Sequence, residues 1–124
     1  MIAAPPTTRT VSPETVTPIK PSEAVRLGCL LAPRQITGTR FDGDDGACAT
    51  GAMFLGGGLG RQPITPAHWV RWPALMGRAR HPEPCLTWSS PHKLILVSFL
   101  IDHLNDSHRW SRERIADWLE GLGY

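Results

Sequence analysis

One short run constrains the fold more than any other feature: LILVSFLI, residues 94–101, in which seven of eight side chains are apolar. A segment that is apolar on nearly every side has to be buried, either at the centre of a domain or between the chains of an oligomer. Because Ser90 and Pro91 form a typical helix start, we expect a central helix over residues 91–106. The β-branched residues leave a strand as the lesser alternative. The run is far shorter than the ~20 residues that span a bilayer, so no membrane segment is expected.

A corner and a second helix are expected directly after this central helix. Asn105 and Asp106 can bond the backbone groups that become free where the first helix ends. Ser111 is the N-cap candidate of the second helix, and Trp110 and Ile115 have the spacing of a hydrophobic staple. The sequence therefore predicts a helix–corner–helix in its C-terminal third. The structural corner consists of Asn105, Asp106, Trp110 and Ser111.

Two shorter helices are expected in the N-terminal half. Ser22, which follows Pro21, is an N-cap candidate for a helix that cannot continue past Pro33. Asp45 can cap a helix of about ten residues that stops at the Gly56–Gly58 cluster. This second helix carries small side chains on one face, so a neighbouring helix can approach it closely.

The first 21 residues are rich in proline and threonine and have little apolar surface. Ordering such a segment costs entropy that its own burial cannot offset. We expect residues 1–21 to form an extended arm that is disordered or is ordered by a partner. A single domain over residues 22–124 then holds four or five short helices, so the predicted fold class is mainly α.

Three cysteines, Cys29, Cys48 and Cys85, cannot all pair within one chain. The N-terminus lacks the apolar stretch of a signal peptide, so we expect reduced thiols and a cytoplasmic location, or a virion if the chain is phage-encoded. Cys48 lies among alanines and glycines, which is typical of a packing residue, and no catalytic set accompanies it. A cysteine-dependent enzyme is therefore the least favoured hypothesis.

Four side chains have the residue types of a zinc site: His81, Cys85, His103 and His108. Thiolate and imidazole are the usual ligands of structural zinc, and His-x4-His lies within the spacing of such sites. The usual Cys-x2-Cys pair is missing, because Trp88 stands where the second cysteine would be. Alternatively, the histidines are polar residues around a helix stop, where a histidine suits the helix dipole. We predict no cofactor, with one structural zinc as the alternative.

The charge is unevenly distributed along the chain, although the net charge is only +2. Residues 47–101 carry five lysines and arginines against the single acid Glu83. This excess favours an anionic or acidic partner without amounting to a nucleic-acid signature. Its tryptophans could stack on bases, but such tryptophans are more often core residues beside a solvated rim of arginines. The candidate interaction residues are Trp69, Arg71, Trp72, Arg78 and Arg80.

A DNA-reading corner is a further alternative for the C-terminal third. The helix that begins at Ser111 would then place Arg109, Arg112 and Arg114 near DNA. Its later residues are acidic, and phosphates would repel them. This reading is therefore weaker than a purely structural corner.

Three stretches resemble a family of short, uncharacterised bacterial and phage proteins: KPSEAVRLGCLLAPRQ (20–35), DGACATGAMFLGG (45–57) and HLNDSHRWSRERIADWL (103–119). That family shares Ser-Glu-Ala-x-Arg-Leu-Gly, Cys-Ala-x-Gly-Ala and His-Leu-Asn-Asp-x-His-x-Trp-x-Arg-Glu-x-Ile-Ala-Asp-Trp. Many members carry Cys-x-x-Cys between the second and third stretches. The resemblance implies that Cys85 and Trp88 occupy the positions of that pair. It also implies one fold unit and brings no reaction.

These observations favour a non-enzymatic interaction protein, bacterial or phage-encoded, as a component of a larger assembly such as a phage particle or a host complex. The N-terminal arm and the basic middle would be its contact surfaces, since arms that order on a neighbour commonly hold assemblies together. Self-association through the apolar run stays open. The main alternative is a small nucleic-acid-binding protein stabilised by zinc.

Overall fold

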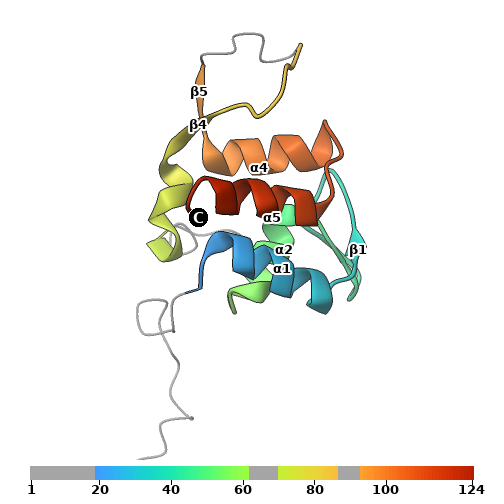
Figure 1. The fold of residues 1–124 in the computed structure, drawn as a ribbon. Helices are drawn as coiled ribbons and strands as arrows, with labels where there is room; N and C mark the ends of the chain where they lie inside the picture. The colour runs from blue at the N-terminus through green and yellow to red at the C-terminus, as the bar shows by residue number, and fades with distance from the viewer. Residues whose placement is uncertain (1–18, 62–69, 87–92) are drawn as a thin grey trace, which may run out of the picture.

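The computed structural model describes residues 19–61, 70–86 and 93–124, and four α-helices are the main elements of these ranges (Figure 1). They are α1 (Pro21–Leu31), α2 (Ala49–Gly56), α4 (Val97–Asp106) and α5 (Arg112–Gly121), accompanied by the 3-10 helix η3 (Pro73–Met76). α1 packs against α2 and α5, and α4 packs against α2, α5 and η3. One cluster of buried side chains draws on all of these elements. Within the described ranges, no helix combines the length and apolar character that crossing a membrane requires.

Five short strands form two separate sheets. The first sheet has the order β1 (Arg34–Gln35), β3 (Gly46–Ala47), β2 (Phe41–Asp42), with β1 parallel and β2 antiparallel to β3. The second is an antiparallel ribbon of β4 (Arg78–Arg80) and β5 (Leu94–Leu96). The ribbon stands above α4 in Figure 1, whereas β1 lies at the right of the helices. The two sheets therefore flank the helices at different places.

The sequence predicts a mainly α domain, and this prediction is wrong. The chain forms a small α/β domain in which 49% of the described residues are helical and 13% lie in strands. The missed strands are only two or three residues long. They are too short to show the alternation by which a strand is recognised in a sequence.

The central helix begins later than expected. Instead of covering residues 91–106, α4 starts at Val97, because the preceding three residues form β5 and pair with β4. The backbone N–H of Val97 donates to the carbonyl of Gly77 over 2.9 Å, which continues the ribbon into the helix. The expected helix start, Ser90 and Pro91, lies outside the described residues. The lesser alternative, a strand, is thus correct for residues 94–96.

α1 begins at Pro21, two residues earlier than a helix capped by Ser22 would. Its N-cap is Lys20. Ser22 is therefore not the cap, and its hydroxyl instead donates to the carbonyl oxygen of Tyr124 at 3.1 Å. The predicted arm, residues 1–21, thus loses its last residue to the helix, and its first 18 residues lie outside the described part of the chain.

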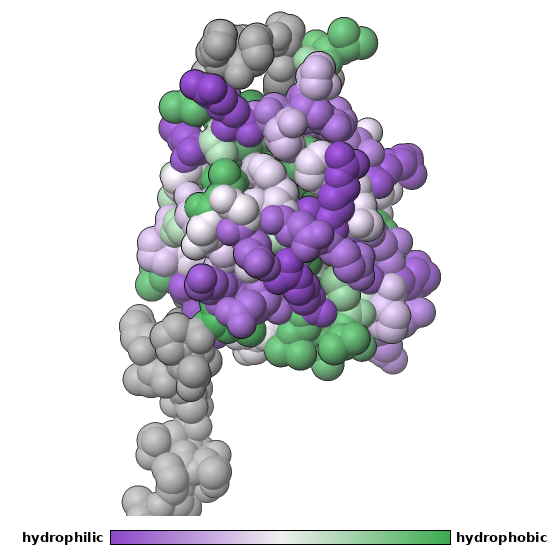
Figure 2. All heavy atoms as spheres, viewed as in Figure 1, coloured by the Kyte–Doolittle hydropathy of each residue, from purple (hydrophilic) through white to green (hydrophobic). Residues whose placement is uncertain are grey.

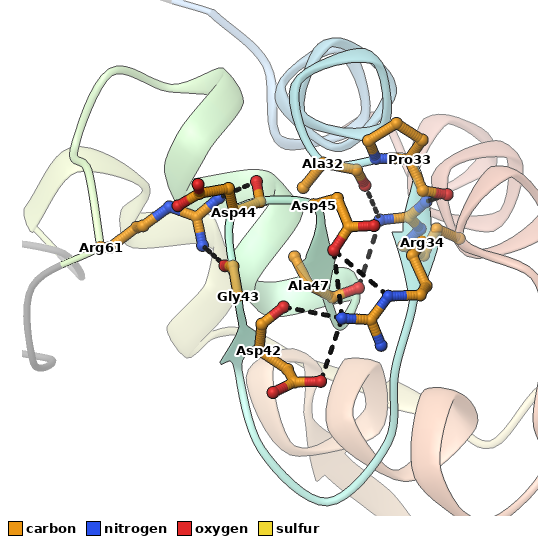
Figure 3. Close-up of polar contacts among 10 residues, drawn as sticks. Ala32, Pro33, Arg34, Asp42, Gly43, Asp44, Asp45, Ala47 and Arg61 are labelled. Carbon is orange, nitrogen blue, oxygen red and sulfur yellow. Dashed lines mark hydrogen bonds and ion pairs between the residues drawn. The ribbon is translucent and has the colours of Figure 1, made fainter.

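Two arginines hold the loop that precedes α2 (Figure 3). Arg34 Nη2 lies 3.0 Å from Asp42 Oδ2 and 3.1 Å from Asp45 Oδ1. Arg61 donates to two backbone carbonyls of the same loop over 2.8 and 2.6 Å. Asp45 therefore faces Arg34, and its predicted role as the cap of α2 is wrong. Cys48 takes that place, with its Sγ accepting from a backbone N–H of the first turn at 3.4 Å.

Two glycines bring α1 and α2 into backbone contact. A Cβ atom at Gly28 would collide with the carbonyl of Ala52, and one at Gly56 would collide with the carbonyl of Ala24. The close approach expected from the small face of α2 is confirmed. Because protein interiors are packed without spare volume, neither position tolerates a larger side chain without moving a helix.

Gly28→Ala should destabilise the protein strongly, because the added methyl group overlaps the α2 backbone and forces the helices apart. We expect the free energy of unfolding to fall by roughly 2–3 kcal/mol, the upper part of the range for overpacked cores. Urea unfolding followed by circular dichroism measures this change. The control is Gly121→Ala in α5, where a Cβ contacts nothing within 4 Å and no loss is expected. Equal effects of the two substitutions would contradict the close approach.

Candidate metal centre

The structure brings all four candidate ligands together. His81 directly follows β4 and Cys85 lies in the same loop, whereas His103 is in the last turn of α4 and His108 is in the corner before α5. Their ligand atoms all lie within 4.8 Å of one another. Two segments that are well separated in the sequence therefore contribute two ligand atoms each.

Four of the six separations among the ligand atoms are close to the edges of a tetrahedron around zinc, and the other two, from His81 to Cys85 and to His103, lie within 4.8 Å. His108 Nε2 lies 3.2 Å from His81 Nε2, 3.1 Å from His103 Nε2 and 3.4 Å from Cys85 Sγ. Cys85 Sγ lies 3.4 Å from His103 Nε2. Zinc bonds of ordinary length place two nitrogens about 3.3 Å apart, and a nitrogen and a sulfur about 3.5 Å apart, in a tetrahedral site. The four separations agree with these edges to within a few tenths of an ångström.

Hydrogen bonding alone does not account for this arrangement. The Nδ1–H of His108 donates to Glu83 Oε1 over 2.8 Å, so in the neutral ring Nε2 carries only a lone pair. One lone pair cannot serve three partners at 3.1–3.4 Å. A cation at the centre would satisfy all four atoms at once.

Glu83 orients His108 from behind. Its Oε1 also accepts from the indole Nε1 of Trp110 at 3.2 Å, and Arg114 Nη2 lies 3.6 Å from its Oε2. The hydrogen bonds from Trp110 and His108, together with the positive charge of the nearby Arg114, hold the pKa of Glu83 below its usual value. A carboxylate that fixes the tautomer and the direction of a ligand histidine is a recurrent feature of zinc sites.

The role of Glu83 is not apparent from the sequence, in which this residue is only the lone acid of a basic stretch. The signal was its position between His81 and Cys85, in the segment HPEPC. Its partners, His108 and Trp110, are 25 and 27 residues away, so only the fold could reveal the contact.

The environment keeps two of the ligand rings neutral. Burial lowers the pKa of His81 and of His103, and the neighbouring His108 lowers both further. Metal ligands must be deprotonated, so these shifts favour binding at neutral pH. The Nδ1 of His81 accepts from the backbone N–H of Glu83 at 3.1 Å, which places the proton of its neutral ring on Nε2. If His81 bound a metal through Nε2, the proton of its ring would move to Nδ1. Nδ1 could then no longer accept from the N–H of Glu83, so this hydrogen bond would be lost.

The predicted helix–corner–helix and its Ser111 cap are confirmed. The predicted role of Asn105 and Asp106 is wrong, because they bond backbone groups of Ala49, Ile36 and Gly38 and not those freed at the end of α4. The hydroxyl of Ser111 caps α5 by accepting from the backbone N–H of Arg114 at 3.1 Å. Trp110 and Ile115 are both buried, as the hydrophobic staple requires. The guanidinium of Arg114 lies 3.7 Å above the Trp110 ring and covers it from solvent. His108 thus sits on a corner held from both sides.

Asn105 holds the corner to the rest of the domain. It is fully buried, and its Oδ1 accepts from Ala49 N and from Gln35 Nε2, both at 3.0 Å. Its Nδ2 donates to the carbonyl of Ile36 and to Asp106 Oδ1, both at 2.8 Å. Four hydrogen bonds are the full capacity of an amide side chain. Asn105 therefore joins α4 to α2 and to the segment around β1.

Gln35 is a second residue that sequence reasoning missed. Besides its bond to Asn105, its Nε2 donates to the carbonyl of Trp110 at 2.7 Å. Its Oε1 accepts from the backbone N–H of Arg112 at 3.1 Å. A single side chain of β1 therefore contacts both sides of the corner. No local pattern around Gln35 predicts these contacts, because each joins residues 70 or more positions apart.

The basic middle does not form one interaction surface. Trp69 lies outside the described residues. Trp72 is a core residue that stacks on Phe54, with 6.5 Å between ring centroids, so it is not available to a nucleic-acid base. Arg71 packs over the Trp72 ring at 5.5 Å. The two remaining candidates are exposed on β4, namely Arg78 and Arg80.

The DNA-reading alternative loses its main residue. Arg112 is 3% exposed, and its guanidinium donates to the carbonyls of Ala32, Pro33 and Ala47 at 2.6, 2.7 and 3.2 Å. It joins the ends of α1 and β3 to the first turn of α5. A guanidinium engaged in this way cannot contact a phosphate.

The two remaining cysteines are packing residues. Burial raises the pKa of Cys48, and it raises that of Cys29 to about 11. Both thiols are therefore protonated at neutral pH, and a thiol is a far weaker nucleophile than a thiolate.

Comparison with known proteins adds no relative: no family model, no curated protein and no solved structure matches this chain. The family resemblance noted in the sequence thus stays a prediction. The resemblance places Trp88 at the position of the second cysteine of the family's Cys-x-x-Cys, and this residue lies outside the described part of the chain. The functional argument rests on the site itself.

Asn105→Leu should destabilise the protein by roughly 3 kcal/mol or more, because it leaves Ala49 N and the Ile36 carbonyl buried without partners, each at a cost of about 1–3 kcal/mol. Thermal and urea unfolding measure the loss. Asn105→Asp keeps one acceptor for Ala49 N but cannot donate, and should be intermediate. A loss below about 1 kcal/mol for the leucine variant would show that the amide network is not structural.

Proposed function

We propose that this chain is a non-enzymatic interaction protein whose fold is completed by one structural zinc ion, held by His81, Cys85, His103 and His108. The observation that supports the zinc is that four ligand atoms from two separate segments meet within 4.8 Å, with four of their six separations close to those of a tetrahedral site. One thiolate with three imidazoles is a donor set that suits zinc.

Four protein ligands favour a structural over a catalytic ion. Catalytic zinc sites keep an open position for water or substrate, whereas structural sites are closed by four side chains. In this centre His81, Cys85, His103 and His108 supply all four positions. The ion would therefore add stability and no reaction.

The metal would tie the loop that follows β4 to the corner before α5. In the described part of this loop, Leu86 is exposed and Cys85 is half-buried. Glu83 already connects the loop to the corner through Trp110, His108 and Arg114. Because the site forms only in the folded chain, the free energy of zinc binding becomes free energy of folding.

Exposed apolar and basic side chains support a role in binding other proteins. Phe99 and Leu30 are 59% and 77% exposed, and Arg78 and Arg80 extend from β4 into solvent. An assembly role through the N-terminal arm belongs to the same proposal. Nucleic-acid binding is the second candidate, and the two exposed arginines of β4 are the observation that favours it.

Protein purified without added zinc should carry one zinc ion per chain, measured by native mass spectrometry. Removal with a chelator should lower the melting temperature by many degrees, because metal binding contributes to folding. Cys85→Ser combined with His103→Ala should abolish zinc binding, whereas His68→Ala, which removes a histidine outside the four, should leave it unchanged. No bound metal together with an unchanged melt would sink the zinc proposal.

Glu83→Gln should weaken zinc binding by about 10–100-fold, the usual effect of removing a carboxylate behind a ligand histidine. Competition with a chromophoric chelator measures the affinity. The control is Glu120→Gln in α5, which removes a carboxylate from an exposed ion pair with Arg26 of α1. If both variants bind zinc as the parent protein does, Glu83 has no part in orienting His108.

A further inference from the structure

The β4–β5 ribbon has one buried face and one open face. Successive side chains of a strand point to opposite sides, and Ala79 and Ile95, which pair across the ribbon, are both buried. The open face therefore carries the two neighbouring cross-strand pairs, Arg78–Leu96 and Arg80–Leu94. Figure 2 shows hydrophilic and hydrophobic side chains side by side over this part of the molecule.

An open hollow of about 290 Å³ lies against this face. Its lining residues are Arg78, Lys93, Leu94, Ile95, Leu96 and Phe99. Leu94 and Phe99 are 52% and 59% exposed, so the floor is apolar and accessible. The volume is at the lower limit of small-molecule cavities, which usually have ~300–1,000 Å³. One apolar side chain of a larger partner fits such a hollow better than an organic cofactor does.

The cations at its rim have no acidic partners within the described ranges. The ion pairs found there involve Arg26, Arg34, Arg114 and His108, and none involves Arg78, Arg80 or Lys93. No acidic residue lines the hollow. Arg78 and Lys93 line the hollow, and Arg80 extends from the same face of the ribbon. Positive charges beside an apolar floor are complementary to carboxylates that flank an apolar side chain.

We propose that this face binds an extended acidic segment of a partner protein, with an apolar side chain in the hollow and carboxylates on Arg78, Arg80 and Lys93. This inference rests on the proposed interaction role and names its surface and the chemistry of its partner. β4 and β5 have only each other as neighbours among the described strands. An extended peptide can therefore add main-chain hydrogen bonds along a strand edge.

The composition of the floor favours a peptide over a nucleic acid. Single-stranded nucleic acids bind to aromatic platforms on which bases stack, within long basic grooves. The apolar side chains of the open face that line the hollow are Leu94 and Leu96, with one aromatic ring, Phe99, beside them. Aliphatic side chains gain little from a base but bury well against another aliphatic side chain.

The ribbon is connected directly to the metal centre. His81 follows Arg80, the last residue of β4, so a zinc ion would fix the end of the strand that carries two of the three cations. The binding test therefore uses the full zinc-loaded chain, and zinc content is measured on the same samples.

The probe is a short fluorescein-labelled peptide in which glutamates surround two leucines and a phenylalanine, and the readout is fluorescence anisotropy. We expect saturable binding that Arg78→Glu combined with Lys93→Glu weakens about tenfold or more. Phe99→Ser should weaken it separately, because Phe99 is exposed and its loss leaves the core intact. Lys20→Glu, a reversal of an exposed charge at the start of α1, should have no effect.

Three results would overturn the inference: equal binding of a peptide with lysines in place of the glutamates, tighter binding of a single-stranded oligonucleotide, or no effect of the ribbon variants. Sedimentation tests a second copy as the occupant, and self-association that Arg78→Glu with Lys93→Glu abolishes would also overturn it. If the folded, zinc-loaded protein fails to bind the peptide, the proposed peptide-binding face is wrong and the structural zinc is unaffected. If protein that contains no zinc binds the peptide, the proposed structural zinc is wrong and the binding face is unaffected.

Discussion

The buried amide of Asn105 is the contact on which the rest of the site depends. With four hydrogen bonds it joins the end of α4 to the start of α2, to β1 and to the segment after it. These bonds set where α4 ends and in which direction the chain leaves it. His103 and His108 lie on either side of this point, so the distance between two ligand atoms follows from a contact that touches neither of them. Buried polar networks of this kind specify one arrangement because any other leaves partners unsatisfied.

Two further contacts place the helices around that corner. Gly28 and Gly56 let the backbones of α1 and α2 touch, which leaves no room for water or for sliding between them. The guanidinium of Arg112 then binds carbonyl groups at the end of α1 and in β3. A buried charged group is costly unless it is hydrogen-bonded, and these carbonyls accept from both terminal nitrogens of Arg112, whereas its Nε is buried without a partner. Polar contacts, as much as apolar packing, thus define this small α/β domain.

The proposed metal centre and the β4–β5 ribbon would depend on each other. His81 and Cys85 belong to the loop that follows β4. The other two candidate ligands, His103 and His108, lie in the last turn of α4 and in the corner before α5. An ion bound among them would transfer the rigidity of the corner to the loop and to the end of β4. The exposed arginines of that strand would then be presented in one orientation. Preorganisation of this kind reduces the entropy that a partner has to overcome on binding.

The sequence by itself determined the local features. The Ser111 cap, the staple of Trp110 with Ile115 and the small face of α2 could be read because each depends on residues a few positions apart. The residue types of the four ligands could also be read, but their meeting could not. The short strands, the Glu83 contact and the pairing of β4 with β5 were decided only by the tertiary structure. The β4–β5 pairs join residues 14 to 18 positions apart, and Glu83 and His108 are 25 positions apart. The strands of the first sheet have only two residues each, so none of these pairings leaves a periodic trace in the chain.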